Sequence, residues 1–390
     1  MRKLMVFAAD ILIAALLVTG IWGVDYLLPQ KGIQAQTALA SASSGKSSSG
    51  SLKQEEESAA QDTEKKAVQS KAGDSQREAA LQQLVDGNAR GLKTTKVKLD
   101  SQDWHKKFAD KFTSKVKSTD TSYTSPDLSV ELSYHSYQSD RLDTTGNGNH
   151  RKYGKGISYV IADIYVGDIT CLQTCFAQDT YGVGYTEMMT SMSSRMKSVL
   201  GVNGDSYSNS RHADNGTIIR NGVIYRAKST DMETCVLNWD GTMKIYSPQE
   251  LNTQQLIEEG AYQSWIFGPS LLDDQGKAKD SFLTWSYIRE SHPRTAIGYY
   301  EPGHYCLVVV DGRQSTTRGM FLEELAKVFQ DLGCKAAYNL DGGHCSFMTM
   351  GNNIANHPYR PEHQVEDGIF ITDLVNPSSI TASGASSWNI

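Results

Sequence analysis

The sequence predicts an α+β (mixed α/β) domain of mixed sheets and packed helices over residues 126–376. Three observations predict this class. Short alternating or continuously apolar runs recur through the region, and two pairs of them flank Asn-Gly or Asp-Gly turns, which indicates strands and hairpins. An amphipathic run lies between two apolar runs near the C-terminus, as in a β-α-β unit. The length and globular composition of the region allow a sizeable core.

A long apolar run at residues 4–28 precedes this domain. Its length suits a transmembrane helix, and Arg2 and Lys3 before it predict a cytoplasmic N-terminus with the C-terminal domain extracytoplasmic. A cleaved signal peptide is the alternative, with residues 38–40 (ALA) as a small-x-small cleavage site. The sequence therefore predicts a single-pass protein of the cell membrane, or a secreted protein if the segment is cleaved.

Polar segments surround the domain. Residues 29–92 are rich in Ser, Gln, Ala, Lys and Glu, a composition that predicts a disordered low-complexity linker because it cannot bury enough apolar surface. Residues 93–125 are transitional, with aromatic residues at every fourth position from Trp104 that favour a helix on the edge of the domain. Residues 377–390 form a polar tail.

Charge and motif content exclude several functions. The chain has 38 Lys and Arg residues against 44 Asp and Glu residues, a formal net charge of −6, whereas nucleic-acid binders carry a basic surplus. We therefore expect no nucleic-acid partner. The six cysteines permit disulfides in an exported domain, but their pairing stays open. The sequence contains neither H-E-x-x-H nor a paired C-x-x-C motif, so no cofactor is assigned. Asp and Asn at strand ends leave Ca²⁺ binding open.

The first half of the domain contains two strand patterns and one helix pattern. Residues 128–137 alternate as LSVELSYHSY, and residues 159–166 form a more buried apolar run, both typical of strands. Residues 187–200 carry methionines at helical spacing, which we interpret as core contacts.

Two hairpins and a helix follow. Residues 217–226 surround Asn221-Gly222, and residues 235–246 surround an Asp-Gly pair; both pairs favour tight hairpin turns. The sequence SPQE at 247–250 resembles a capping box with Pro at the first helical position. We expect the helix that it opens to end at Gly260.

The β-α-β pattern spans the most informative stretch. Residues 306–310 and 335–340 are apolar strand patterns, and the amphipathic helix between them has Thr316 or Thr317 as its N-cap. A crossover of this kind makes the two strands parallel. The Asp-Gly loops that follow the strands therefore lie at the same edge, where open α/β sheets bind ligands.

Six ordered motifs give the domain a specific resemblance. They are VNGDSY (202–207), GTIIRNGVIYR (216–226), FGPSLL (267–272), PRTAIG (293–298), LVVVDGR (307–313) and NLDGGHCS (339–346). Together, over about residues 126–375, they resemble the phosphodiester glycosidase family. The family includes the lysosomal enzyme that removes N-acetylglucosamine from a sugar-1-phosphate diester, and bacterial exopolysaccharide-associated homologues.

The motifs of the resemblance and the chemistry of their residues give a set of candidate site residues. The candidate catalytic residues are Asp341, Asp205 and Arg294. The candidate substrate-binding residues are Asn203, Gly204, Thr295, Asp311, Asn339, Gly342, Gly343, His344 and Arg360. Three positions depart from the family pattern: Asp205 stands where Gly is usual, and His344 and Cys345 interrupt the glycine-rich loop.

These residue types suit cleavage of a sugar from a phosphodiester. A guanidinium binds phosphate oxygens in a bidentate fork, which suits Arg294. The backbone N–H groups of Gly342 and Gly343 would add donors in a nest. Glycosidases commonly use a pair of carboxylates, for which Asp341 and Asp205 are the candidates. We expect Arg294, Asp341 and Asp205 to converge on one concave site.

Two functions follow from the sequence. The first is an extracytoplasmic hydrolase that cleaves a sugar from a sugar-1-phosphodiester linkage in a glycan, exopolysaccharide or cell-wall polymer. The second is a catalytically silent glycan-binding or cell-envelope polysaccharide-assembly protein on the same scaffold. Both have a carbohydrate or a sugar-phosphate polymer as partner, and the membrane through the N-terminal helix.

Overall fold

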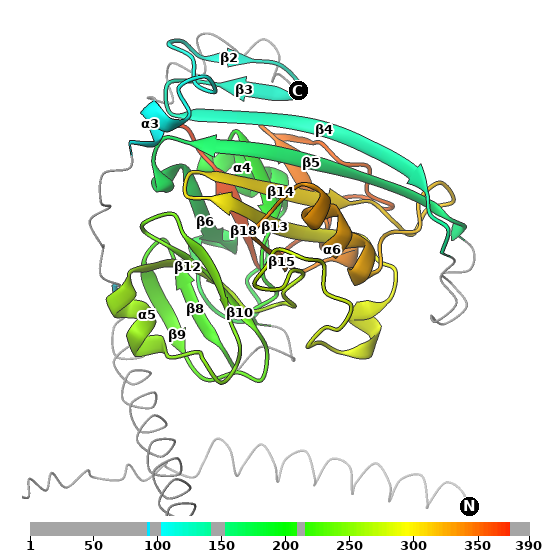
Figure 1. The fold of residues 1–390 in the computed structure, drawn as a ribbon. Coiled ribbons are helices and arrows are strands. Elements are labelled where there is room, and N and C mark those ends of the chain that lie inside the picture. The colour runs from blue at the N-terminus through cyan, green and yellow to red at the C-terminus, as the bar shows by residue number, and fades with distance from the viewer. Residues whose placement is uncertain (1–91, 94–102, 142–152, 209–214, 375–390) are drawn as a thin grey trace, which may run out of the picture. The chain divides into compact units, whose positions relative to one another are not determined.

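The computed structural model describes residues 92–93, 103–141, 153–208 and 215–374 (Figure 1). The predicted anchor, almost all of the predicted linker and the predicted polar tail lie outside these residues. The described residues belong to one unit, residues 65–390. Within them, no helix is long and apolar enough to span a bilayer.

A seven-stranded sheet organises the domain, in the order β15-β13-β14-β5-β4-β3-β2. Its neighbouring strands are all antiparallel. The strands are β2 (Lys117–Ser118), β3 (Ser122–Thr124), β4 (Leu128–Gln138), β5 (Gly156–Val166), β13 (Arg294–Glu301), β14 (His304–Val310) and β15 (Ala336–Asn339).

Three smaller sheets complete the domain, in the orders β17-β16-β7-β18-β6, β11-β10-β12 and β1-β9-β8. Their strands are β1 (Leu92–Lys93), β6 (Leu172–Phe176), β7 (Leu200–Asn203), β8 (Thr217–Arg220), β9 (Val223–Ala227), β10 (Thr234–Asn238), β11 (Met243–Tyr246), β12 (Ala261–Trp265), β16 (Met348–Met350), β17 (Asn353–Ile354) and β18 (Asp367–Ile371). The four α-helices of the described residues are α3 (Trp104–Lys107), α4 (Met189–Met196), α5 (Thr253–Glu259) and α6 (Leu322–Asp331).

The β-α-β unit forms, but with a strand between its two strands. β14 and β15 each pair antiparallel with β13, so they run parallel to each other without being neighbours. The α+β class is therefore confirmed, whereas the prediction of mixed sheets is wrong, because β13 separates the only predicted parallel pair. The consequence for the site holds: the carboxyl ends of β14 and β15 lie at one edge, beside the start of β13.

Apolar side chains cover both faces of this sheet. Along β14, Tyr305, Leu307 and Val309 join the core shared with the smaller sheets, and the alternate residues Cys306 and Val308 join the core under α6. Figure 1 shows α6 against β13 and β14. Burial on both faces explains why β14 is a continuous apolar run.

The two predicted hairpins are confirmed. Asn221 and Gly222 connect β8 to β9 with φ of 51° and 75°, as a type I′ turn requires. β10 and β11 pair around the second predicted turn.

Two predicted helix starts are wrong. Ser247 and Glu250 bond to each other in a turn, and α5 begins after Asn252, whose side chain caps it. Its predicted end at Gly260 is confirmed. The N-cap of α6 is Phe321, whose N–H donates to Glu324. The hydroxyl of Thr317 instead accepts from the N–H of Ser158 and donates to the carbonyl of Asp311, because the helix begins only at Leu322.

Candidate active site

A small pocket lies at the edge where β14 and β15 end and β13 begins. Its volume is about 130 Å³. Three charged side chains line it: Arg294, Arg313 and Asp341. The other lining residues are Phe267, Tyr287, Ile288, His292, Pro293, Leu340, Gly342 and Gly343. The edge predicted from the β-α-β pattern therefore does carry a pocket, and two of the three predicted catalytic residues line it.

Arg294 contributes a buried cation. Its side chain is 3% exposed. Nε donates to the carbonyl of Met320 at 3.1 Å, and Nη2 donates to the carbonyls of Ile288 and Glu290. No carboxylate of the described residues forms an ion pair with it. Burial lowers the pKa of Arg294 to about 9, so the group stays charged at neutral pH. A buried cation without a carboxylate partner on a pocket wall favours an anionic ligand.

Arg313 supplies a second, half-buried cation. Nη1 donates to the Tyr359 hydroxyl at 2.8 Å, and Nη2 lies 3.3 Å from His292 Nδ1. The other ring nitrogen of His292 lies 2.8 Å from the carbonyl of Tyr287. Because a guanidinium only donates and a carbonyl only accepts, His292 fits here as the neutral tautomer with its proton on Nε2.

Asp341 is the one carboxyl on the pocket wall. Its Oδ1 accepts from the N–H of Gly342 at 2.8 Å. Burial raises its pKa to about 6, and the charges of Glu366 and Asp205 act in the same direction. A carboxyl that titrates near neutral pH can accept and donate protons during a reaction.

The glycine pair next to Asp341 has a different role from the predicted one. The N–H of Gly342 donates to Asp341, and the N–H of Gly343 donates to the carbonyl of Pro293 at 2.9 Å. Neither amide is therefore available as a nest for phosphate. Gly343 has φ of +69°, and a Cβ there would lie 3.2 Å from Nη2 of Arg313. Glycine at this position allows the loop to approach the arginine.

Three predicted binding residues lie beneath the pocket and support it. Asn203 Nδ2 donates to the carbonyl of Asp341 at 2.6 Å, and the Thr295 hydroxyl donates to Asn203 Oδ1 at 2.6 Å. Asn339 Nδ2 donates to the carbonyl of Gly268 at 2.8 Å. All three side chains are buried. Asn203 and Thr295 fix the backbone at Asp341, Asn339 fixes the backbone at Gly268, and none of the three lines the pocket.

Asp205 belongs to a buried ion cluster. Its carboxylate accepts from the N–H groups of Ile266 and Phe267 at 2.9 and 3.1 Å, and lies 3.2 Å from Arg220 Nη2. Arg220 also pairs with Asp367. Asp205 is 2% exposed and does not line the pocket. The predicted convergence of three side chains is thus reduced to Arg294 and Asp341, because the bonds of Asp205 are all internal.

Gly204 connects the ion cluster to the pocket loop. A Cβ at this position would lie 2.6 Å from Asp367 Oδ1, so a side chain would collide with the cluster. Its carbonyl accepts from the N–H of Asp341 at 3.1 Å. Gly204 therefore has a packing role.

The remaining predicted binding residues lie around the pocket without lining it. Asp311 is buried and accepts from Asn356 at 3.0 Å and from the N–H of His357 at 2.9 Å; burial raises its pKa. The His344 ring nitrogen lies 3.1 Å from the carbonyl of Pro361. Arg360 is exposed and lies over the ring of Tyr359.

Sequence reasoning missed Arg313, His292 and Arg220, the ion partner of Asp205. Arg313 had a usable signal, because it ends the LVVVDGR motif at the same sheet edge as Asp341. Arg220 lies within the GTIIRNGVIYR motif, but its pairing with Asp205 and the contact of His292 with Arg313 join distant segments, and no local pattern shows them.

Cysteines and metal ligands add nothing to the pocket wall. In the described part of the chain, no group of three or more His, Cys, Asp and Glu side chains could hold a metal ion. All six cysteines are free thiols. Cys306 and Cys334 are buried, as predicted, with their sulfurs 3.7 Å apart. Burial raises the pKa of the Cys345 thiol, which disfavours a nucleophilic thiolate.

The fold and site therefore define an α+β domain with a small pocket that two arginines and one aspartate line. Residues 196–372 match the model of the phosphodiester glycosidase family. That span contains every residue that lines the pocket. The resemblance seen in the sequence motifs is confirmed over these residues.

Several proteins are similar to this chain. The SPbeta prophage-derived uncharacterized protein YomE of Bacillus subtilis (strain 168) is 32% identical over 193 residues, which are 48% of this chain and 29% of that protein. The match thus spans less than a third of that relative's length. The catalytic domain of zebrafish N-acetylglucosamine-1-phosphodiester alpha-N-acetylglucosaminidase, auto-inhibited by its pro-peptide, has a TM-score of 0.48 at 19% identity, over 63% of this chain and 88% of that one. A hypothetical protein from Synechocystis has a TM-score of 0.45 at 12% identity, over 63% and 62%.

Proposed function

We propose that this protein hydrolyses a sugar-1-phosphodiester linkage and releases the sugar. One observation carries the proposal: the buried guanidinium of Arg294, without a carboxylate partner, lines the same small pocket as Arg313 and the titratable carboxyl of Asp341. Two cations and one carboxyl favour a bound anion. The small volume suits one phosphodiester group, so a polymer would lie across the mouth of the pocket.

The residues divide the work of the reaction between them. Arg313 and Arg294 hold the phosphate oxygens by charge-assisted hydrogen bonds. Asp341, once ionised, accepts a proton from the water whose oxygen attacks the anomeric carbon. The bond between the anomeric carbon and the phosphate oxygen breaks, and the phosphomonoester leaves with the bonding electrons. Because phosphate is a weak base, its departure needs no strong general acid.

The location of the reaction is part of the proposal. The apolar run at residues 4–28, with Arg2 and Lys3 before it, supports an exported domain that is tethered to the membrane, or secreted after cleavage. The substrate would then be a glycan, an exopolysaccharide or a cell-wall polymer outside the cytoplasm.

Hydrolysis in ¹⁸O-labelled water tests the proposal. The full-length protein is incubated with a panel of sugar-1-phosphodiesters, and the products are identified by mass spectrometry. We expect the label in the sugar, since water attacks carbon. Label in the phosphate would identify a phosphodiesterase that cleaves the P–O bond. Absence of any product would leave the glycan-binding alternative.

Matched variants assign the residues. Arg313→Gln should lower kcat/KM by about tenfold or more, because it removes charge-assisted contacts of about 1.5–3 kcal/mol each. Lys244→Gln removes an exposed positive charge on β11 and should leave kcat/KM unchanged. An equal effect of the two substitutions would remove Arg313 from the mechanism.

A further inference from the structure

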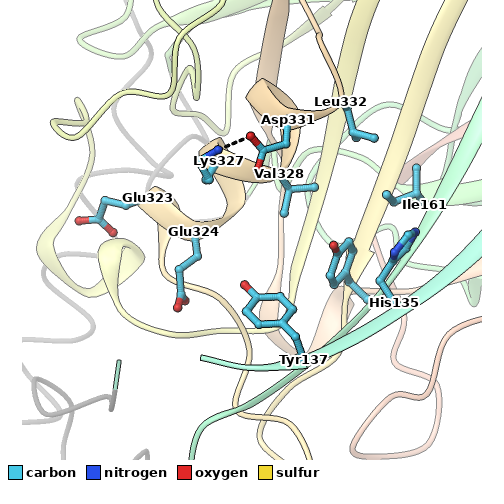
Figure 2. A pocket seen from close by; sticks show the side chains of 10 residues that line it. His135, Tyr137, Ile161, Glu323, Glu324, Lys327, Val328, Asp331 and Leu332 are labelled. Carbon is cyan, nitrogen blue, oxygen red and sulfur yellow. Dashed lines mark hydrogen bonds and ion pairs between the residues drawn. The ribbon is translucent and has the colours of Figure 1, made fainter. Parts of the chain in front are cut away.

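A second concave surface lies between α6, the C-terminal end of β4 and the N-terminal half of β5 (Figure 2). It shares no lining residue with the pocket. Its volume is about 520 Å³. We call it the aromatic groove. Its floor consists of His135 and Tyr137 from β4 and Tyr159 and Ile161 from β5, and its wall consists of Glu323, Glu324, Lys327, Val328, Asp331 and Leu332 from α6 and its end. Alternate residues of a strand point to one face, which brings the floor residues together under the helix.

The floor belongs to a stretch of strand with little cover. β3 pairs only with residues 129–131 of β4, so the rest of β4 pairs with β5 alone. Tyr137 in this stretch is 42% exposed. Exposed aromatic side chains that gather in a concavity mark a binding site more often than a packing defect.

The aromatic rings of the floor are already ordered. The His135 ring stacks on Tyr159, with centroids 5.0 Å apart and an angle of 16° between the planes, and Tyr137 meets Tyr159 edge-on at 6.4 Å. Neither phenol hydroxyl has a hydrogen-bond partner in the part of the chain that the structure describes. Burial raises the pKa of Tyr137 to about 12, so its hydroxyl is a neutral donor at physiological pH.

The charged rim decides between neutral and anionic ligands. Lys327 is paired with Asp331, and Glu323 lies 3.4 Å from Arg141. Of the charged residues that line the groove, three are acidic and one is basic. The pocket beside Asp341 has the opposite balance, with two arginines and one aspartate. An anion is therefore disfavoured in the groove. Glu324 is largely buried and pairs with Arg318 at 2.6 Å, so the carboxylates of Glu323 and Asp331 and the ammonium group of Lys327 are the rim groups that can bond to hydroxyls.

We propose that the aromatic groove binds neutral sugar residues of a glycan chain. A sugar ring presents a face of C–H groups, which matches the aromatic floor, and an edge of hydroxyls, which matches the charged rim and the two phenols. The groove lies on the face of the sheet. A peptide added as a strand would instead use the unpaired backbone of the edge, so the side chains favour the sugar.

A second cavity adjoins the groove at Tyr137. This cavity of about 790 Å³ reaches Asp311, Gln314 and His357. Gln314 directly follows Arg313 of the pocket. A glycan chain could thus be held along the groove while its phosphodiester enters the pocket. This joint use of groove and pocket rests on the proposed function, whereas sugar binding in the groove does not. The floor residues precede residue 196, so the span matched by the family does not include them.

Binding to sugars tests the inference directly. The full-length protein is applied to immobilised neutral oligosaccharides of glucose, galactose, mannose, rhamnose and N-acetylhexosamines, and the best ligand is titrated by calorimetry. We expect Tyr137→Ala to weaken binding by about tenfold or more and Tyr137→Phe by less than about threefold, because the ring provides most of the contact. Tyr134→Ala is the matched control. Tyr134 is 49% exposed on the opposite face of β4, where its hydroxyl donates to the carbonyl of Ala355 at 3.1 Å, and its loss should leave sugar binding in the groove unchanged.

Three outcomes would overturn the inference. The first is that no oligosaccharide binds, and the second is that Tyr137→Ala binds as tightly as the wild type. The third is that reduced and alkylated casein, an unfolded polypeptide, binds in place of sugars, which would indicate strand addition. Melting curves of each variant show whether it is folded, and Lys327→Ala offers a second change to the rim, at a side chain that is 56% exposed. Hydrolysis of a methyl sugar-1-phosphodiester, which is too small to reach the groove, is measured in parallel. If binding fails while hydrolysis persists, only the groove is reassigned; if hydrolysis fails while binding persists, only the proposed reaction is.

Discussion

Replacement of Asp341 by Asn should stabilise the protein at neutral pH while it abolishes activity. Burial raises the pKa of Asp341 from 3.8 to about 6, so the folded protein disfavours the ionised form. The corresponding cost at pH 7 is at most (6 − 3.8) × 1.36, or about 3 kcal/mol. Asn has the same shape without the charge, and its Oδ1 can still accept from the N–H of Gly342.

The sign of the pH dependence follows from the raised pKa. Below pH 3.8 the carboxyl is neutral in both the folded and the unfolded state, and the stability that its neutral form provides is fully present. That stability is lost as pH rises through about 6. The advantage of Asp341→Asn should therefore be near zero at pH 3.5, grow between pH 4 and 6 and level off above.

Urea unfolding of both proteins at pH 4, 5, 6 and 7.5 measures this difference. Hydrolysis of the substrate found in the labelled-water assay gives the second readout: wild-type kcat should fall below about pH 6 as the base becomes protonated, and the Asn variant should be inactive at every pH. A stability difference that does not vary with pH would show that Asp341 titrates normally. Full activity in the folded Asn variant would remove it from the reaction.

Three further changes probe the supports of the site. Arg294→Lys should lower both activity and stability, the latter by about 1–3 kcal/mol in urea melts, because one ammonium group cannot occupy both the Nε position at Met320 and the Nη2 position at Ile288 and Glu290, so charge-assisted hydrogen bonds are lost; unchanged stability would contradict the observed carbonyl contacts. Gly343→Ala should cost about 1–2 kcal/mol of backbone strain and also reduce kcat/KM through its contact with Arg313. Gly333→Ala, with φ of +80° and no atom within 4 Å, is the control and should show the strain alone. Asp367→Ala should cost about 3–5 kcal/mol, because it leaves the buried charge of Arg220 only partly compensated; a smaller loss in a thermal melt would mean that water enters the cluster.

Local patterns in the sequence predicted several parts of the fold well. The hairpin at Asn221 and Gly222 follows from the backbone freedom of those two residues, and the end of α5 follows from Gly260. Helix starts were predicted less well. Ser247 could cap a helix or close a turn with the same hydrogen bonds, and only the packing of the next residues selects the turn.

The site was predicted in part for a related reason. Two apolar strands that end in polar loops place Asp341 at the functional edge, whatever else the sheet contains. The insertion of β13 between those strands brings Arg294 to the same edge. The sequence motifs include both residues but do not show that they line one pocket.

By itself, the sequence determined the class of domain, the hairpins, the edge on which the polar loops lie and the resemblance to phosphodiester glycosidases, because these depend on periodicity, turn chemistry and short motifs. Only the tertiary structure decided which charged residues face the pocket. Asp205 follows a buried strand and Arg294 begins one. Backbone N–H groups and Arg220 satisfy the charge of Asp205, whereas the guanidinium of Arg294 donates to backbone carbonyls and forms no ion pair with a carboxylate of the described residues. The balance of charge around a buried group is set by segments distant in sequence, and no local pattern encodes it.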